Sequence, residues 1–345
     1  MDASPPPERT EITVTLPPEL RPPLKVALAR PVTTLPAPDA LPGGARYEPK
    51  WDGFRLLLAV NDERVSLWSR RGKDLTVSFP DIVAAAEDQL PAGVILDGET
   101  VVWSGDRLDF DALLRRLGSG SSRVRRLARD QPASFVAFDV LAIADRDARA
   151  LPLDARRSLL EELAVDWSPP LNLSPMTSDP EKAAEWFESL TASGIEGLIV
   201  KGGGQAYVGG DRTWLKLKHR STRDVVCAAV IGARERPEEL VIGLPVNGVL
   251  RIVGRSTPLS SAVSRELGAL LRAPEAPHPW PTEVKPGAVD RFTRGGRDRV
   301  ALTLVEPMVV EILADIAMTG DSFRHPVRFV RARPEIPVAD VTATT

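Results

Sequence analysis

The chain has a single cysteine, Cys227, among its 345 residues. One cysteine excludes a disulfide framework and any zinc site made of several cysteines, and it fits the reducing cytoplasm. The sequence also lacks an apolar run long enough to cross a membrane. Residues 1–20 are rich in proline and mixed in charge, without the apolar centre of a signal peptide. We therefore expect a cytoplasmic protein that makes no membrane contact.

The chain has no excess of positive charge either, because 44 lysines and arginines face 47 aspartates and glutamates, for a net charge of −3. This excludes a protein coated in basic residues, so any contact with nucleic acid has to be local. The basic residues are unevenly spread, and three groups stand out. These are Arg115, Arg116, Arg123, Arg125, Arg126 and Arg129; Lys216, Lys218, His219, Arg220 and Arg223; and Arg324, Arg328, Arg331 and Arg333.

Length and composition suit two domains or one large one, since 345 residues with 43% hydrophobic content can bury sizeable cores. Residues 1–22 are expected to form a flexible leader, because their prolines block regular structure. The sequence changes to short strand-like segments after His219, so we place the boundary near residue 220. The expected domains are 23–220 and 221–345, the second with a disordered C-terminal tail.

Apolar periodicity predicts an α+β fold for the first domain. Strands are expected at 54–60, 65–69, 134–143, 196–201 and 214–218, and helices at 80–90, 110–117, 154–165 and 179–192. Residues 94–103 are expected to run strand, turn, strand, with the bend at Asp97-Gly98. The glycines at 202–204 and 209–210 predict a mobile loop.

The second domain is predicted to be a small barrel. Strands are expected at 224–233, 239–244, 249–255 and 300–314, a helix at 258–272 and a long loop at 274–299. Short strands with turn signals and one helix are typical of the five-stranded OB barrel, which binds nucleic acids. The expected architecture is thus antiparallel sheets with helices, followed by an OB-fold β-barrel.

The stretch Glu48-Pro49-Lys50-Trp51-Asp52-Gly53-Phe54-Arg55 places a lysine just before a turn and a strand. Asp52-Gly53 favours a tight turn, because glycine accepts backbone angles that other residues resist. Lys50 is therefore expected at a strand edge, where a lysine can serve as a nucleophile. A surface lysine beside a hairpin is the plainer interpretation, since K-x-D-G alone is a weak signal.

Further charged residues lie at the ends of predicted apolar strands: Glu99, Glu196, Lys201, Lys216 and Lys218. Each alone is more often a solvated charge. Together with Lys50 they suit a phosphate-transfer site, because lysines neutralise phosphate oxygens and carboxylates hold a divalent metal. Strict alternation in 214–218 directs both of its lysines to one face of a strand. Phe138 can stack on a base, although such an aromatic is more often part of a core.

These motifs together resemble the ATP-dependent DNA ligases of the covalent nucleotidyltransferase superfamily. The resemblance runs from about residue 24 to 335 and is closest to the small bacterial ligase C type and the ligase module of ligase D. Six motifs match in the family's order: Lys50-Trp51-Asp52-Gly53, Ser69-Arg70-Arg71-Gly72, Asp97-Gly98-Glu99, Phe138-Asp139, Glu196-Gly197 with Lys201, and Trp214-Leu215-Lys216-Leu217-Lys218. Six ordered matches make coincidence a poor explanation.

The resemblance implies a reaction in three steps. Lys50 takes AMP from ATP, AMP passes to the 5′-phosphate at a nick, and the 3′-hydroxyl seals the strand and releases AMP. Lys216 and Lys218 are implied as catalytic partners of Lys50, and Glu99 and Glu196 as ligands of Mg²⁺ or Mn²⁺. The implied nucleotide contacts are Glu48, Arg55, Arg70, Glu99, Phe138, Glu196, Lys201, Lys216, Lys218 and Arg331.

The last family motif, R-x-D-K, is altered in this chain. Arg331 can fill the arginine position, whereas Arg333 and Pro334 stand where an aspartate and a lysine are expected. The resemblance implies that the OB domain closes over ATP, with Arg331 at the pyrophosphate, and then clamps DNA about a hinge near 219–223.

Nicked duplex DNA is the implied partner, and we expect the arginines of 115–129 to contact its phosphates. Only 49 residues precede Lys50, so no large separate DNA-binding domain is expected, and Ku or other end-joining proteins are candidate helpers. A monomer is expected.

Three other functions share part of this pattern. An mRNA-capping guanylyltransferase shares the lysine motif and the two-domain plan, and the choice between ATP and GTP distinguishes it. A non-catalytic OB protein that binds nucleic acid leaves Lys50 and the carboxylates without a purpose. An NAD-dependent ligase is disfavoured, because the chain has no four-cysteine zinc module.

Overall fold

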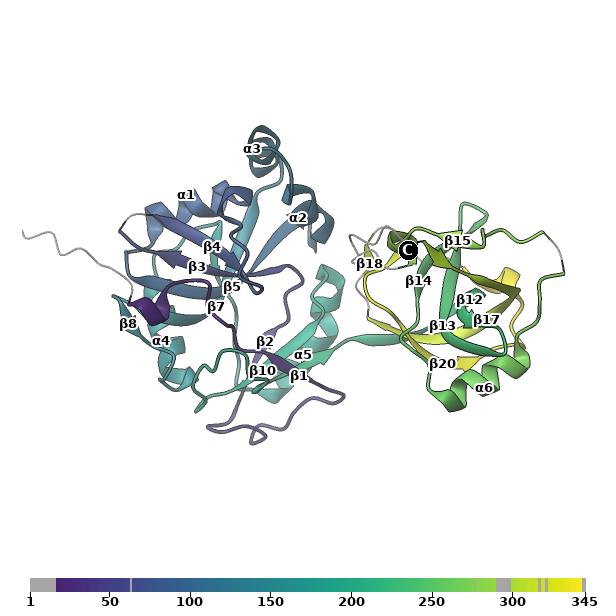
Figure 1. The fold of residues 1–345 in the computed structure, drawn as a ribbon. Coiled ribbons are helices and arrows are strands. Elements are labelled where there is room, and N and C mark those ends of the chain that lie inside the picture. Colours follow the sequence, from purple (N-terminus) through teal and green to yellow (C-terminus); the bar gives the residue numbers. More distant parts are fainter. Residues whose placement is uncertain are drawn as a thin grey trace, which may run out of the picture. The chain divides into compact units, whose positions relative to one another are not determined.

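The computed structural model describes residues 17–342, apart from 63, 276, 290–298, 316–317 and 320–321. The chain divides into two compact units, Met1–Lys218 and His219–Thr345 (Figure 1). The leader expected at 1–22 lies mostly outside the described residues. Its last part, however, contains the short helix η1 (Pro18–Leu20), whose Leu20 is fully buried.

A seven-stranded sheet forms the larger part of the first unit, with strands in the order β4-β3-β5-β7-β8 and with β6 and β9 at its margins. Its strands are β3 (Phe54–Val60), β4 (Val65–Ser69), β5 (Val94–Ser104), β6 (Arg107–Leu108), β7 (Ala133–Ile143), β8 (Arg146–Asp147) and β9 (Leu171–Leu173). The segments around it are η2 (Thr76–Ser78), α1 (Pro80–Gln89), α2 (Phe110–Arg116), α3 (Ser121–Asp130) and α4 (Leu153–Leu163).

The apolar run in β3 is continuous because both faces of this sheet are covered. Leu56 and Leu58 enter a core with Phe79 and Ile82, beneath α1. Leu57 and Ala59 enter a second core on the opposite face. The second core faces the smaller sheet of the unit.

The smaller sheet has the strand order β1-β11-β10-β2. Its strands are β1 (Ala29–Val32), β2 (Ala45–Pro49), β10 (Gly197–Gly202) and β11 (Trp214–Lys218). Helix α5 (Pro180–Ser189), followed by η3 (Leu190–Ser193), covers one face, where Tyr47 and Leu198 are buried. The other face carries Ile199 and Trp214, which join Leu57 in the core between the two sheets.

Arg156 and Asp139 form a fully buried ion pair behind this core, with side-chain exposures of 1% and 0%. Arg156 also donates to the carbonyls of Leu151 and Gln205, at 2.6 and 2.9 Å. Removing one member of a buried pair leaves the other charge buried without compensation. We therefore expect Arg156→Ala to lower the free energy of unfolding by about 3–5 kcal/mol in denaturant melts.

The matched control is Arg149→Ala, which removes the arginine from a much more exposed pair with Asp147. Solvent screens such a pair, so its loss is expected to cost less than about 1 kcal/mol. Equal losses in the two variants would contradict a structural role for the buried pair.

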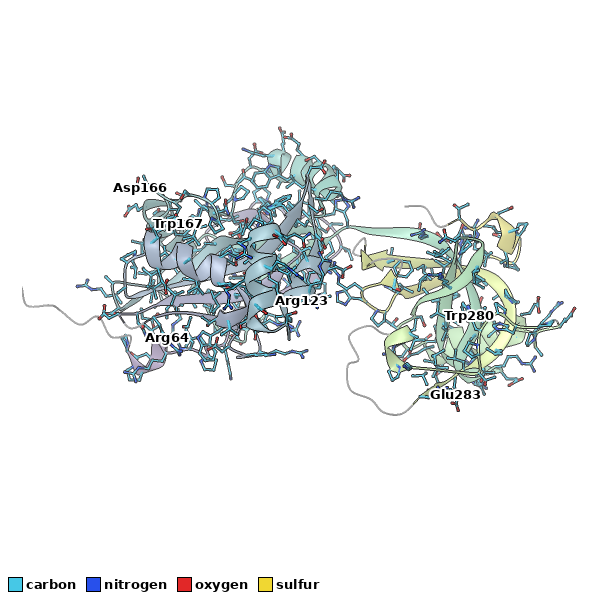
Figure 2. All side chains as sticks on the ribbon, turned by 90° about the horizontal axis from the view of Figure 1, so that it is seen from above. Arg64, Arg123, Asp166, Trp167, Trp280 and Glu283 are labelled. Atoms are coloured by element: carbon cyan, nitrogen blue, oxygen red, sulfur yellow. The ribbon has the colours of Figure 1, made fainter. Side chains whose placement is uncertain are left out.

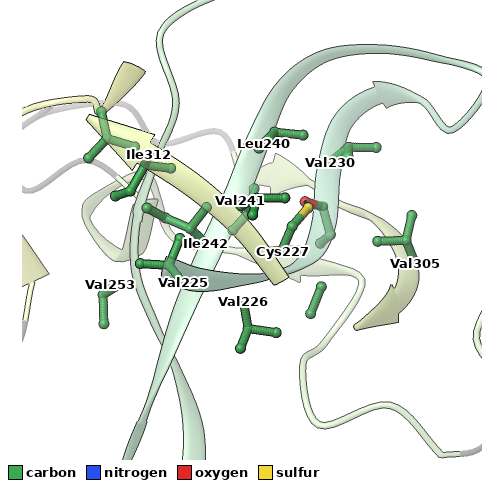
Figure 3. Close-up of a cluster of buried hydrophobic side chains, with 14 of the residues drawn as sticks. Val225, Val226, Cys227, Val230, Leu240, Val241, Ile242, Val253, Val305 and Ile312 are labelled. Atoms are coloured by element: carbon green, nitrogen blue, oxygen red, sulfur yellow. Dashed lines mark hydrogen bonds between the residues drawn. The ribbon is translucent and has the colours of Figure 1, made fainter. Parts of the chain in front are cut away.

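The second unit is built on a five-stranded sheet in the order β14-β13-β12-β17-β20. Its elements are β12 (Arg220–Ala233), β13 (Arg236–Val246), β14 (Val249–Arg255), α6 (Ser261–Leu270), β15 (Glu283–Val284), α7 (Pro286–Val289), β16 (Val300–Ala301), β17 (Thr303–Asp315), β18 (Met318–Thr319), β19 (Ser322–Phe323), β20 (Arg328–Ala332) and η4 (Val338–Asp340). Figure 3 shows part of its core, which contains Cys227 together with Val225, Val241 and Ile312. Burial raises the pKa of the Cys227 thiol to about 12, as fits a packing residue.

Sheets with helices are confirmed, and most strand pairs are antiparallel, but β1 pairs with β11 and β7 with β9 in parallel. Several local predictions are wrong. Asp97-Gly98 is not a bend: β5 runs through it, with a register shift between the two residues. The glycine loop expected to be mobile is packed, since Gly203 is buried and its amide donates to the Gly44 carbonyl at 2.8 Å. The loop expected at 274–299 contains β15 and α7. The expected disordered tail is instead structured as far as Thr342, and Val341 packs in the core.

Candidate active site

Lys50 is fixed by backbone pairing at the end of β2. Its amide donates to the Gly197 carbonyl at 2.8 Å, and the Glu196 amide donates to the Lys50 carbonyl at 3.0 Å. Tyr47 points into the core under α5, so alternation directs Glu48 and Lys50 to the opposite face, toward the larger sheet. The predicted strand-edge position is therefore observed.

Two motif glycines are required by close backbone contacts. A Cβ on Gly53 would lie 2.2 Å from the Thr100 carbonyl oxygen. A Cβ on Gly197 would lie 2.1 Å from the Leu217 carbonyl oxygen, and its φ of +142° strains any other residue. Gly197 pairs with Lys218, on the strand beyond it. Lys50 and Lys218 therefore flank a position that has no side chain.

Glu196 is the carboxylate that holds these lysines. Its Oε2 forms ion pairs with the Nζ atoms of Lys50 and Lys218, the second at 3.2 Å, and its side chain is 8% exposed. Burial alone would raise the pKa of Glu196, but the two ammonium groups outweigh it and hold the pKa at about 2. Glu196 is therefore ionised throughout the neutral range.

Lys216 adds a third positive charge to this group. It lies on β11 opposite Ile199, two residues from Lys218 and on the same face. Burial, followed by repulsion from Lys218 and Lys50, lowers the pKa of Lys216. Lys50 and Lys218 thus pair with Glu196, and Lys216 adds positive charge beside them, an arrangement that favours binding of additional anionic oxygens such as those of phosphates.

Glu99 approaches Lys50 from the larger sheet. It lies on β5 opposite Arg55. Burial raises the pKa of Glu99 to about 8, and the charges of Lys50 and Arg55 oppose this shift only in part. Lys50 therefore has a side-chain carboxyl group from each sheet in its neighbourhood, and burial favours the protonated form of the one on Glu99.

Arg55 is held by a network that the sequence did not predict. Its guanidinium pairs with both oxygens of Asp97, at 2.9 and 2.6 Å, and donates to the Ala27 carbonyl at 2.7 Å. Tyr207 completes the network, because its hydroxyl donates to Asp97 at 2.6 Å and accepts from the Ala27 amide at 3.1 Å. Asp97 belongs to the Asp97-Gly98-Glu99 motif, which the sequence singles out, whereas Tyr207 belongs to no such motif.

Lys201 and Glu48 form a buried ion pair of 2.8 Å beneath the aromatic residues of the site. Lys201 Nζ donates to the Phe138 carbonyl at 2.9 Å and lies 4.7 Å from the Phe138 ring centroid and 4.5 Å from that of Trp214. The two rings meet edge to face, and Phe138 remains half-buried. Phe138 and Trp214 together form an aromatic wall of the site. The sequence did not predict that Trp214 belongs to it.

Two predicted site residues are not on the strands that carry this group. Arg70 follows β4 and is exposed. Arg331 belongs to the second unit, where its side chain is 61% exposed and its Nε lies 2.5 Å from Glu311 Oε2. The other predicted residues come together between the two sheets of the first unit.

The carboxylates fit a site for Mg²⁺ that is shared with a substrate. In the part of the chain that the structure describes, no three or more histidine, cysteine, aspartate or glutamate side chains are grouped so that they could hold a metal ion by themselves. Mg²⁺ usually binds through one or two carboxylates together with waters and substrate phosphates, so a closed cage is not needed. Glu196 and Glu99, on either side of Lys50, can supply those oxygens.

Comparison with known proteins identifies the family. Residues 27–218 match the model of the ATP dependent DNA ligase domain. The chain belongs to the ATP-dependent DNA ligase family. This ligase is 35% identical over 313 residues to DNA ligase C2 of Mycolicibacterium smegmatis, covering 86% of this chain and 88% of that protein. It is 34% identical to DNA ligase C of Mycobacterium tuberculosis, covering 91% of each.

A solved structure supports the same assignment. The crystal structure of the ligase domain from M. tuberculosis LigD matches this ligase with a TM-score of 0.50 and 28% identity, covering 92% of this chain and 98% of that one. The enzyme is thus an ATP-dependent DNA ligase, and the guanylyltransferase and non-catalytic alternatives are set aside. Among its described helices, none is long and apolar enough to cross a bilayer.

Proposed function

We propose that this ligase seals nicks in duplex DNA through a covalent AMP on Lys50. The observation that carries the proposal is the position of Lys50 Nζ, which shares the Glu196 carboxylate with Lys218 and has Lys216 on the same side. A nucleophilic amine beside two further cations suits attack on a phosphoryl group whose oxygens gain charge in the transition state.

The proposed reaction consists of three substitutions at phosphorus. The ammonium group of Lys50 first gives up a proton to solvent. The resulting amine attacks the α-phosphorus of ATP, forming a P–N bond, losing a second proton to solvent and releasing pyrophosphate. The 5′-phosphate at the nick then displaces Lys50 from AMP. Finally the 3′-hydroxyl loses its proton and attacks that 5′-phosphate, forming the phosphodiester and releasing AMP. Lys216 and Lys218 stabilise the phosphoryl oxygens in these steps.

The aromatic wall suits the adenine ring. Phe138 presents its half-buried ring between the sheets, with Trp214 edge-on and Lys201 beneath. The buried Lys201–Glu48 pair holds β10 and β2 together below it, so the Glu48 main chain is kept in a fixed place from which to contact the base. Arg55, bound to Asp97, orients this wall rather than reaching for the nucleotide.

The proposed metal is Mg²⁺ or Mn²⁺, held by Glu196 and Glu99 together with phosphate oxygens. When bound, it would supply positive charge to the leaving pyrophosphate. Nicked duplex DNA is the proposed substrate. The name of a relative, a multifunctional non-homologous end joining protein LigD from Mycobacterium bovis that is 32% identical over 277 residues, supports end-joining proteins such as Ku as candidate partners.

Incubation with ATP labelled on the α-phosphate tests this function. The protein should carry the label through a denaturing gel, and adding nicked duplex DNA should release it as the nick is sealed. GTP labelled in the same way should leave the protein unlabelled. A protein that seals nicks with ATP but never carries the label would overturn the covalent route.

We further propose that the five-stranded second unit is an OB barrel whose C-terminal arginines act only in the first step. Arg331 is the candidate, because it keeps the family's position and its exposed side chain is held at Nε by Glu311. Arg331→Ala is expected to slow labelling by ATP by about 10²-fold, the usual loss when a group that stabilises transition-state charge is removed. Sealing of a pre-adenylated nick without ATP should change far less. Normal labelling with failed sealing would place Arg331 on DNA instead.

A further inference from the structure

Helix α3 presents an arginine face to solvent. Arg123, Arg125, Arg126 and Arg129 are all exposed, whereas Val124 is only 3% exposed. At about 100° per residue, the four arginines fall within roughly 160° of the helix, on the side opposite Val124 and its partly buried neighbours. The helix packs against α1, α2 and η2 at the margin of the first unit (Figure 1), and Figure 2 labels Arg123 at the surface.

The positive charge of this face is not compensated within the described part of the chain, where no ion pair joins any of the four arginines to an acid. Arg123, Arg126 and Arg129 follow one another at spacings of three, and like charges at such spacings destabilise a helix. With Asp130 the only acidic residue on α3, the helix carries a net charge of +3 in a chain of net −3. Because this repulsion destabilises the helix, the arginine face indicates that a binding partner supplies the opposite charge.

The neighbouring arginines of the sequence cluster show the contrast. Arg116 is 1% exposed, and its guanidinium pairs with both oxygens of Asp81 at 2.8 and 2.9 Å. Arg115 lies 3.2 Å from Asp109 and donates to Gln131 at 3.0 Å. These two are structural, so the expected contact surface of 115–129 is reduced to the arginines of α3.

We propose that the α3 arginine face binds the phosphate backbone of the duplex that the ligase seals. The proposal rests on the proposed function, because it takes nicked DNA as the substrate. Arginine binds phosphate bidentately, and phosphate contacts position a protein without reading sequence, as the sealing of any nick requires. A helix of ten residues is about 15 Å long, which spans roughly four base-pair steps of duplex.

A protein partner fits this face less well. Protein interfaces have an apolar or aromatic centre surrounded by polar residues. The exposed side chains of α3 are arginines, serines and one aspartate, and its apolar residues are buried or half-buried against the unit. Without an apolar centre, the face matches the uniform charge of a nucleic-acid backbone.

The test is the salt dependence of binding to a nicked duplex that lacks the 3′-hydroxyl and so cannot be sealed. The variant is Arg123→Gln, Arg125→Gln and Arg126→Gln together in the full chain, since glutamine keeps the helix propensity. The slope of log K against log salt should become shallower by about 0.9 for each arginine that neutralises a phosphate, up to about 2.7 in total. Labelling by ATP should stay at the wild-type level.

The control removes three charges from elsewhere on the same unit, as Arg30→Gln, Arg64→Gln and Arg146→Gln. All three are exposed, and Arg64 is labelled in Figure 2. The control should keep the wild-type slope. A wild-type slope in the α3 variant, or an equal change in the control, would overturn the proposal, and the first result would favour a protein partner.

Two further measurements keep the test decisive. If the triple variant melts early, the double variant Arg123→Gln with Arg126→Gln should lose about 1.8 from the slope. If the wild type binds the nick but never carries AMP, the proposed covalent route fails while the α3 surface stands. Loss of labelling in the α3 variant with a wild-type slope would overturn the α3 proposal alone.

Discussion

Lys50→Ala is expected to abolish the covalent labelling of the protein by ATP, a loss on the order of 10⁴-fold or more, as for other deleted nucleophiles. The reason is that the proposed bond to AMP forms at the Lys50 amine, whereas the other lysines of the site are held elsewhere. Lys216 and Lys218 lie on a different strand, β11, separated from β2 by β10. Labelling is measured by incubation with α-labelled ATP and a denaturing gel.

The variant should remain folded, since Glu196 keeps its ion pair with Lys218 at 3.2 Å and is not left buried without a partner. Thermal melts check this point. The matched control is Lys182→Ala, which removes an exposed lysine from α5 on the far face of the smaller sheet. Sealing of a pre-adenylated nick should survive better than labelling in Lys50→Ala. Persistent labelling of this variant would refute the nucleophile.

Glu196→Ala is expected to lower labelling by about 10²- to 10³-fold, comparable with the loss of one preorganised charge in other enzymes. Glu196 holds Lys50 and Lys218, and its removal leaves three lysines without their nearest carboxylate. Repulsion among them then displaces the nucleophile from its place. The rate of labelling at saturating ATP is the quantity to measure.

A metal titration separates the two roles of Glu196. If the carboxylate binds Mg²⁺, as we propose, Glu196→Ala should require much more Mg²⁺ for half-maximal labelling. If it only positions lysines, the maximal rate falls and the Mg²⁺ midpoint stays. Glu196→Gln keeps the shape of the side chain and removes its charge. The control is Glu188→Gln, which changes an exposed glutamate on α5. An unchanged rate and midpoint in Glu196→Ala would contradict both roles.

The positions of most site residues could be predicted because strand alternation fixes which side chains share a face. Trp214, Lys216 and Lys218 follow that rule, and so do Glu48 and Lys50 on β2. The ion pairs between neighbouring strands of one sheet could not be predicted. Arg55 with Asp97, and Lys201 with Glu48, pair across distant parts of the chain, and no local pattern encodes such pairing.

The errors in secondary structure have physical causes as well. Asp97-Gly98 suggested a turn, but Gly98 is required by packing, since a Cβ there would lie 2.5 Å from the Phe135 ring. The sequence did not predict helix α3, because arginines interrupt its short apolar pattern. Val124, Leu127 and Ala128, at spacings of three and four, were the signal.

The most direct test of the central claim is to locate the AMP by mass spectrometry. The wild-type protein is incubated with ATP and Mg²⁺, digested under basic conditions that preserve a phosphoramidate, and mapped peptide by peptide. The account predicts one AMP, on the peptide that contains Lys50, and its disappearance when nicked duplex is added before digestion. An AMP on Lys216 or Lys218, or on no lysine while nicks are still sealed, would contradict it.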